Sequence, residues 1–403
     1  MNNLLQTFNL ELHKEYLTAT TNRAINSNGS FQTEFNSVFI HGMYWVLCCS
    51  NLIKFDILNE LNIKEVFNHL LEKCKRELCL DGPSLNIYSI NPSDLVSPSI
   101  LSLLSGTQIN ALKKNRIVES NIHATNKFIK SLSIFKFDKM YINHSKNCLI
   151  QQDIRFVYSA LLISYLSNSL DFSRIKQTLP ISKLINLLND LQNKDGGFGR
   201  RKNDESHAGY TFCAVASVAI IKLISVDDDI NIMLNFNRLN RWLLKRVIVS
   251  ESHIMSPMDQ SYCFNGRTGK KCDVCYSWWV TASLKMLEYI NPESNNANFI
   301  SNPKVFGKLI NGVLCHQNNI YGGFQKTPFI FDCRDHSDPL HTFLSISALS
   351  LLTNNYLEHP DSNSHKFTRL TESFNSISKI DPVSVLPEVF SITSDILAKS
   401  TQI

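Results

Sequence analysis

The chain has 403 residues, of which 43% are hydrophobic and 19% charged, and its formal net charge is +5. This composition supplies a sizeable apolar core and argues against wholesale disorder. The small positive charge argues against a nucleic-acid-binding protein, whose basic footprint is larger and clustered.

The N-terminal residues 1–14 are polar and do not resemble a secretory signal. No uncharged apolar run reaches the roughly 18 residues of a membrane span, so we expect no transmembrane helix. The eleven cysteines are an odd number and lie mostly in apolar stretches. This usage indicates reduced thiols and a cytoplasmic location.

Two kinds of helix alternate along the chain. Residues 181–191 and 305–314 have apolar side chains at i, i+3, i+4 and i+7, which predicts amphipathic helices. Residues 212–221, 276–287 and 343–352 are apolar nearly all round, so these helices must be buried on most faces. An earlier helix of this second kind begins near Arg155.

The order of these parts repeats. An amphipathic helix leads to a turn, 195–198 or 321–324, and a polar loop then opens an apolar helix. Such periodicity predicts an array of helix pairs. A closed double ring buries the apolar helices better than an open solenoid does. We therefore expect an all-α fold, an α/α barrel, with 1–403 as a single domain and polar insertions at 115–147, 227–235, 292–302 and 358–365.

A dense group of polar residues lies at 265–279, just before one apolar helix. Asp273 and Cys275 offer an oxygen and a sulfur ligand, and His341, which opens a later helix, offers a nitrogen. Three protein ligands leave one open position on a tetrahedral zinc ion, as in catalytic sites. Cys272 and Cys275 also form a C-x-x-C motif. Its alternative interpretations are redox chemistry and half of a Cys₄ metal site.

Cationic and histidine side chains recur at the starts of the apolar helices. Arg267 and Lys270 share the loop of Asp273, while His207 and Arg155 stand at other helix starts. If these helices are parallel, their N-termini meet at one mouth of the barrel and favour an anion such as diphosphate. Taken singly, each Arg or Lys is better explained as a solvated surface charge, and His207 as a structural histidine.

Aromatic side chains are frequent in the apolar helices. Most of them belong to an ordinary core, but a few suit a funnel for a long hydrocarbon. The candidates are Tyr44, Trp45, Phe156, Tyr158, Tyr210, Phe212, Trp278, Trp279 and Phe343.

With these residues in view, the chain resembles the β subunits of protein prenyltransferases over about 39–389. Four segments carry the resemblance: Arg267-x-x-Lys270-x-x-Asp273-x-Cys275-Tyr276, Asp338-Pro339-Leu340-His341, Glu205-Ser206-His207-Ala208-Gly209 and Asp153-x-Arg155-Phe156.

The resemblance implies roles for individual residues. Asp273, Cys275 and His341 would bind zinc and, with Tyr276, form the catalytic centre. The diphosphate group would contact His207, Arg267, Lys270, Tyr276 and Lys326. The lipid and peptide pocket would be formed by His41, Tyr44, Trp45, Arg155, Tyr210, Trp278 and Trp279.

Within this family, the chain resembles the Rab geranylgeranyltransferase (type II) branch in 42–45, 273–280 and 381–387. That branch implies geranylgeranyl diphosphate as lipid donor, an α subunit as partner, and a Rab GTPase with its escort protein as substrate. The alternatives are a type I geranylgeranyltransferase or a farnesyltransferase β subunit, which act on CaaX proteins. Lys326 resembles the type I branch and could replace Mg²⁺, and His41 leaves the lipid length open.

Two further classes are alternatives. A non-catalytic α/α-barrel scaffold would tolerate changes at Arg267, Lys270 and His341. A terpene cyclase shares related barrels and Gly-Gly-Phe turns, but the chain has no D-x-D-D motif, because 227–229 lies in a polar insertion.

Overall fold

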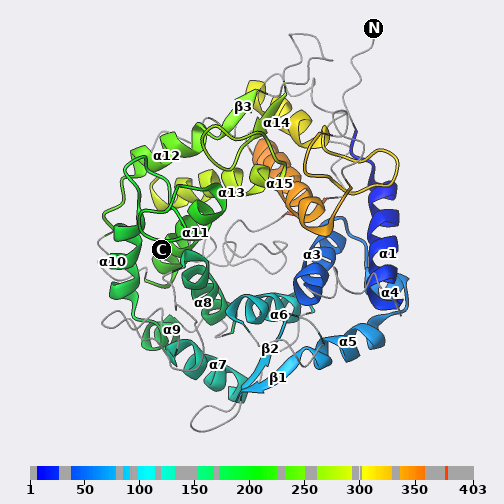
Figure 1. The fold of residues 1–403 in the computed structure, drawn as a ribbon, viewed down its shortest axis with the longest axis horizontal. Coiled ribbons are helices and arrows are strands. Elements are labelled where there is room, and N and C mark those ends of the chain that lie inside the picture. Colours follow the sequence, from blue (N-terminus) through cyan, green and yellow to red (C-terminus); the bar gives the residue numbers. More distant parts are fainter. Residues whose placement is uncertain are drawn as a thin grey trace.

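The computed structural model describes residues 7–26, 38–78, 85–90, 92, 99–113, 119–131, 153–167, 172–225, 232–249, 261–292, 299, 302–328, 336–358 and 377–379. These residues form two concentric rings of helices (Figure 1). The inner ring consists of α3 (Phe39–Leu52), α6 (Ile100–Leu112), α8 (Ile154–Ser167), α11 (Ala208–Ile224), α13 (Cys275–Ile290) and α15 (Pro339–Glu358). The outer ring consists of α1 (Leu10–Asn26), α4 (Ile57–Glu60), α5 (Lys64–Lys73), α7 (Glu119–Ser131), α9 (Phe172–Thr178), α10 (Ile181–Leu191), α12 (Phe236–Leu244) and α14 (Pro303–Leu314).

The inner ring is closed. Each inner helix packs against the next one in chain order, and α15 packs against α3. An inner helix therefore has neighbours on both sides and an outer helix behind it, which explains why its sequence is apolar nearly all round. The predicted α/α barrel is confirmed, with 181–191 and 305–314 in the outer ring as their amphipathic pattern requires.

Two short antiparallel hairpins supplement the helices. Strand β1 (Lys75–Leu78) pairs with β2 (Leu85–Tyr88), and β3 (Val247–Val249) pairs with β4 (Tyr262–Phe264). The sequence pattern does not predict these strands. The second hairpin matters for function, because β4 leads directly into the loop that precedes α13.

One expected insertion contains part of the barrel. Residues 119–131, within the expected insertion 115–147, form α7, which packs against α8, α9 and β2. The other three expected insertions lie largely outside the described residues. Among the described helices, none combines the length and the apolarity needed to cross a membrane.

The two Gly-Gly-Phe turns have the same construction. Gly196 has φ +101° and Gly322 has φ +74°, a region in which glycine is favoured over other residues. After each turn a phenylalanine is fully buried, and its N–H donates to a threonine Oγ1 of the following inner helix. The pairs are Phe198 with Thr211, at 3.0 Å, and Phe324 with Thr342, at 2.9 Å.

The N-terminal helix closes the seam of the barrel. His13 of α1 is buried and accepts a hydrogen bond from the N–H of Gly323 through Nδ1, at 3.0 Å. Its Nε2 lies 3.0 Å from Oε1 of Gln317, and its ring stacks on Phe324. A Cβ at Gly322 would lie 2.2 Å from the carbonyl oxygen of Leu12, so α1 can approach only because this residue is glycine.

Candidate metal centre and anion pocket

Three successive inner helices begin in the same way. The N–H of a residue one or two positions before each helix donates to the carbonyl oxygen of a buried phenylalanine. The pairs are His207 with Phe198 (2.9 Å), Asp273 with Phe264 (3.0 Å) and Asp338 with Phe324 (3.4 Å). The residues three positions later are Tyr210, Tyr276 and His341. Equivalent positions of successive repeats therefore meet at one mouth of the barrel.

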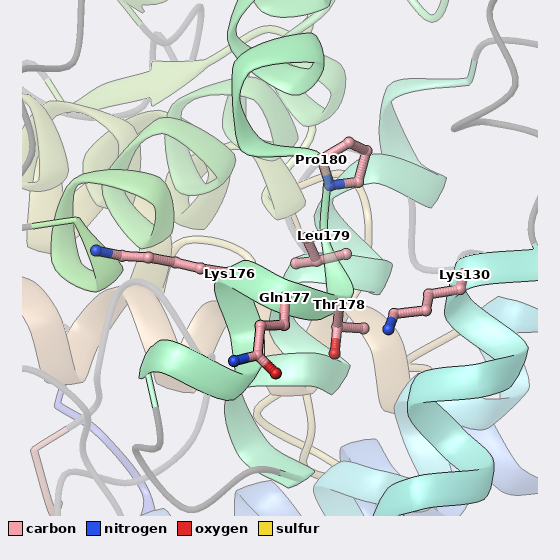
Figure 2. Close-up of a pocket in the computed structure, with 6 residues that line it drawn as sticks. All are labelled: Lys130, Lys176, Gln177, Thr178, Leu179 and Pro180. Atoms are coloured by element: carbon pink, nitrogen blue, oxygen red, sulfur yellow. The ribbon is translucent and has the colours of Figure 1, made fainter.

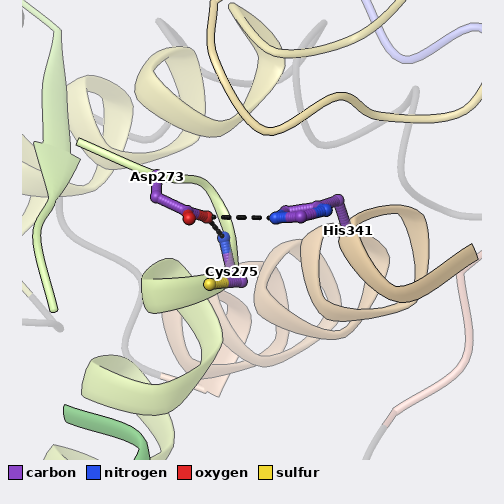
Figure 3. A group of neighbouring side chains, drawn as sticks. All are labelled: Asp273, Cys275 and His341. Carbon is purple, nitrogen blue, oxygen red and sulfur yellow. Dashed lines mark hydrogen bonds and ion pairs between the residues drawn. The ribbon is translucent and has the colours of Figure 1, made fainter. Parts of the chain in front are cut away.

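The three predicted zinc ligands lie together at this mouth (Figure 3). The ligand atoms of Asp273, Cys275 and His341 lie within 4.8 Å of one another, and all three residues are partly buried. Oδ1 of Asp273 lies 3.2 Å from Nε2 of His341 and accepts the N–H of Cys275 at 3.0 Å. An oxygen, a sulfur and a nitrogen from two helix starts thus face one point, a donor set suited to zinc.

The electrostatics of this group favour a cation. Burial and the neighbouring Asp273 carboxylate raise the pKa of the Cys275 thiol well above its usual value. Burial opposes charging of His341, but hydrogen bonds to Asp273 and Asp338 outweigh it and raise its pKa to about 9. Burial also disfavours the ionised Asp273, yet the bonds from His341 and Cys275 lower its pKa. A bound cation would replace the protons that now balance this negative site.

His207 and Tyr276 form a hydrogen-bonded pair beside the metal ligands. Nε2 of His207 lies 3.0 Å from the hydroxyl of Tyr276, and Nδ1 of His207 accepts the N–H of Gly209. Because Nδ1 is an acceptor, the neutral ring carries its proton on Nε2 and donates to Tyr276. Burial and the nearby Arg267 lower the pKa of His207, which keeps this tautomer. The Tyr276 proton can then point to a ligand.

The predicted cationic residues are spread around this pair. Arg267 forms an ion pair with Glu205, a residue of the motif at 205–209 for which the sequence predicted no role. Lys270 is exposed in the same loop, and Nζ of Lys326 lies 4.0 Å from Oδ2 of Asp273. Arg155, at the start of α8, binds Asp153 at 2.6 Å and lies over the Tyr210 ring, 5.8 Å from its centroid.

The predicted pocket aromatics fall into two groups. Trp278 is fully buried and Tyr44 is buried with its hydroxyl accepting from Gln108, so both are parts of the wall. The ring of Trp279 meets Phe212 edge-on and is only partly buried. Trp45 lines a cavity of about 510 Å³ that also includes His341, so this cavity adjoins the metal ligands.

His41 lies on the inner helix α3 with Trp45. Its Nδ1 lies 2.7 Å from Oγ of Ser105, on α6, and its ring stacks on Trp45. Burial lowers the pKa of His41 to about 4, so the ring is neutral near pH 7. The wall of the barrel therefore has a polar but uncharged point between α3 and α6.

Another pocket lies on the outside of the barrel. It has a volume of about 360 Å³ and lies between α7 and the connection from α9 to α10 (Figure 2). Lys130, Lys176 and Pro180 are among its lining residues. None of the residues predicted for the site lines this pocket, so it is separate from the metal ligands.

Two residues that support the site were given no role from the sequence. A Cβ at Gly266 would lie 2.2 Å from the ring of Tyr276, so only glycine leaves room for the tyrosine. The Gly266 carbonyl also accepts the N–H of Ala208, which joins this loop to α11. Asp338 contacts His341 directly. Its place three residues before a candidate ligand was a signal that could have found it.

The fold and this site define the class of protein. The model of the family described as "Prenyltransferase alpha-alpha toroid domain" matches residues 8–386, and the chain belongs to this family. A solved structure titled "Candida albicans protein geranylgeranyltransferase-I complexed with GGPP" is similar with a TM-score of 0.63. The match covers 96% of this chain and 97% of that one at 22% identity, and it shows the fold.

Curated relatives from several branches of the family are similar in sequence. The Geranylgeranyl transferase type-1 subunit beta of Arabidopsis thaliana is 30% identical over 206 residues, which is 50% of this chain and 46% of the relative. The Protein farnesyltransferase subunit beta of Schizosaccharomyces pombe is 30% identical over 243 residues (59% and 55%). The Geranylgeranyl transferase type-2 subunit beta of Saccharomyces cerevisiae is 28% identical over 246 residues (60% and 56%). The matches span about half the length of these relatives.

Proposed function

We propose that the chain is the catalytic β subunit of a zinc-dependent protein prenyltransferase, with its catalytic domain extending over 1–403. It would join an isoprenoid to cysteine thiols of a protein substrate. The observation that carries this proposal is the convergence of Asp273, Cys275 and His341 beside the His207–Tyr276 pair. A metal-ligand set next to an anion pocket is what thiol transfer from a diphosphate ester requires.

The three ligands fit zinc by their chemistry and leave room for a fourth. Carboxylate, thiolate and imidazole are the usual zinc ligands, and three of them define an open catalytic site. Zinc bound here would supply a Lewis acid that lowers the pKa of the substrate thiol. Cys275 and His341 must lose their protons to bind it, so the affinity for zinc rises with pH.

His207, Tyr276 and the nearby cations would bind the diphosphate. Burial, Cys275 and Asp273 raise the pKa of Tyr276 above its ordinary value, so its hydroxyl stays protonated and donates. Each such donor to a developing anion is worth on the order of 2–4 kcal/mol of barrier. The diphosphate would compete with Glu205 for Arg267, and Lys270 extends the positive charge to the exposed side of the loop.

Aromatic residues of the inner helices would line the path of the lipid and peptide. Trp45, Tyr210 and Trp279 are partly buried on three different inner helices. Arg155, paired with Asp153, stands at the mouth and would orient the substrate polypeptide.

Within this class, we propose geranylgeranyl transfer to the C-terminal cysteines of Rab GTPases. The amino-acid sequence of 42–45 and 273–280, which resembles the type II branch, supports this assignment. Two type-2 β subunits are also among the similar proteins. The partners would be an α subunit and a Rab bound to its escort protein, and the location would be cytoplasmic.

A specific observation favours a second candidate, a type I enzyme that acts on CaaX proteins. Lys326 is exposed next to the metal ligands, with Nζ 4.0 Å from Oδ2 of Asp273. The ammonium group of Lys326 would then replace Mg²⁺ as the positive charge that balances the diphosphate.

The two candidates are separated by transfer assays with the assembled enzyme. Labelled farnesyl and geranylgeranyl diphosphate should each be offered to a CaaX peptide and to a Rab with its escort protein. Double geranylgeranyl transfer to the Rab alone supports type II, whereas transfer to the free peptide supports type I.

Metal content tests the broader proposal. We expect about one zinc ion per chain, and Cys275→Ala should lose both the metal and the activity. An assembled enzyme that retains full transfer activity after complete metal removal would reject the zinc mechanism. Full function after changes at Arg267 and His341 would instead favour a scaffold.

A further inference from the structure

His341 is held from the side opposite to the metal ligands. Its Nδ1 lies 2.5 Å from Oδ2 of Asp338, while Nε2 faces Asp273. The other oxygen of the same carboxylate, Oδ1, accepts the backbone N–H of His341 at 2.9 Å. One carboxylate therefore caps the start of α15 and also fixes the ring of the residue three positions later.

This arrangement defines which nitrogen is available to a metal. Because Nδ1–H donates to Asp338, the lone pair of the neutral ring is on Nε2, the atom that faces Asp273. The His341 side chain is 14% exposed and that of Asp338 is 43% exposed. The carboxylate thus approaches the ring from the more exposed side of the site, while Nε2 points to Asp273.

The internal repeat makes the role of Asp338 specific. Asp338 is the counterpart of Asp273 one repeat later, because the N–H of each donates to the carbonyl oxygen of a buried phenylalanine. The side chain of Asp273 accepts the N–H two residues on and faces the metal point, whereas that of Asp338 accepts the N–H three residues on and turns to the ring. The same position would thus serve as a ligand in one repeat and as a support in the next.

We propose that Asp338 is a positioning residue of the metal centre, which fixes the tautomer and the orientation of His341 so that Nε2 meets the ion. This inference rests on the proposed function. A carboxylate behind a histidine ligand restricts ring rotation and raises the basicity of the ligating nitrogen. Loss of such a partner weakens metal binding by roughly 10–100-fold.

The experiment measures zinc affinity of the full chain, in the complex in which it purifies, by competition with a chromophoric chelator. Asp338→Ser keeps a good helix cap but is too short to hold the ring. We expect its zinc dissociation constant to rise by about 10–100-fold. Asp338→Asn keeps a cap and an acceptor but loses the charge, so its rise should be smaller.

A matched control changes a helix cap that has no histidine beside it. Asp56 accepts the N–H of Asn59 at the start of α4. Asp56→Ser makes the same change at a cap that holds no histidine, so it should keep the cap and leave the zinc affinity unchanged. A second readout is the visible absorption of the Co²⁺-loaded protein, which should shift in Asp338→Ser because the coordination geometry changes.

The outcomes separate the two proposals. If the unchanged protein binds no zinc, the proposed function fails. If the unchanged protein binds zinc and both Asp338 variants bind it within twofold of the same affinity, only the positioning role fails. Should Asp338→Ser not fold, the Asp338→Asn variant decides, since unchanged affinity and an unchanged Co²⁺ spectrum in that variant overturn the proposal.

Discussion

At the scale of single residues, the position of the Tyr276 ring depends on residue 266 being a glycine. The ring lies against Gly266, where an added Cβ would be 2.2 Å from it, and its hydroxyl meets His207. Real Cβ atoms do not approach other atoms so closely, so any larger residue must move the ring. The hydrogen bond to His207 would then be broken without a change in either partner.

Gly266→Ala should therefore lower turnover while leaving the metal in place. If Tyr276 donates to the diphosphate as proposed, we expect kcat to fall on the order of 10²-fold, the cost of one misplaced donor. Steady-state kinetics and the zinc content of the purified enzyme test this expectation.

A double variant serves as the control. In a Tyr276→Ala background, Gly266→Ala should cost little more, because the ring that it displaces is gone. Two losses that simply multiply would show that Gly266 acts elsewhere.

At the scale of elements, both Gly-Gly-Phe turns depend on a hydrogen bond from the buried N–H of the phenylalanine to a side chain. The N–H groups of Phe198 and Phe324 both donate to threonines of the next inner helix. Neither N–H group donates to a helical carbonyl. If the threonine hydroxyl is removed, the N–H therefore has no helical acceptor to replace it.

Thr211→Val and Thr342→Val should each destabilise the protein by about 1–3 kcal/mol, because a buried N–H loses its partner while the shape is kept. Urea unfolding measures the change. Thr281→Val is a matched control: Thr281 is equally buried in α13, but its hydroxyl donates to the carbonyls of Ser277 and Trp278 instead of accepting from a turn N–H. A cost at Thr281 equal to the other two would contradict this account.

The sequence predicted the elements whose patterns are long and periodic. The inner helices α11, α13 and α15 and the outer helices α10 and α14 follow from apolar periodicity. The hairpins β1–β2 and β3–β4 were missed, because three or four residues are too short to show alternation. Helix α7 was hidden by its polar, lysine-containing sequence, which resembles a loop.

For the candidate site, the sequence motifs predicted which residues take part but not most of the contacts between their side chains. A shared metal site of Asp273, Cys275 and His341 was predicted from their ligand types and from the motifs in which they stand, and the three lie together in the structure. The contacts of Glu205 and His41 are with residues more than 60 positions away, which spacing does not encode. Asp338 lies only three positions before His341, so its contact was within reach of a spacing argument.

At the scale of the whole molecule, the two ends of the ring are joined by the packing of α15 against α3 and by hydrogen bonds of α1. His13 joins α1 to Gln317 and to the turn at Gly323, more than 300 residues away. Burial is the main cause that lowers the pKa of His13 to about 4, so the ring is neutral near pH 7. In that state Nδ1 can accept the Gly323 N–H.

Acid should open this seam. The folded pKa of His13 is about 4, below the value of 6.5 in the unfolded chain, so the unfolded state takes up the proton first as the pH falls. Stability should therefore decrease between pH 6.5 and pH 4, by up to about 3 kcal/mol from this residue. His13→Gln should flatten that limb of the stability curve, as measured by urea unfolding at several pH values.

The exposed His123 of α7 offers the comparison. His123→Gln should keep the slope of the unchanged protein. A His13→Gln variant with the same acid dependence as the unchanged protein would mean that other groups govern the acid limb.

The seam also has a consequence for synthesis. Its two sides, His13 and Gly323, are separated by 310 positions. At roughly 5–20 residues per second, the ribosome completes the second side about 15–60 s after the first. During that time the apolar flank of α3 that later meets α15 has no native cover, so nascent chains should depend on chaperone protection until translation is nearly finished.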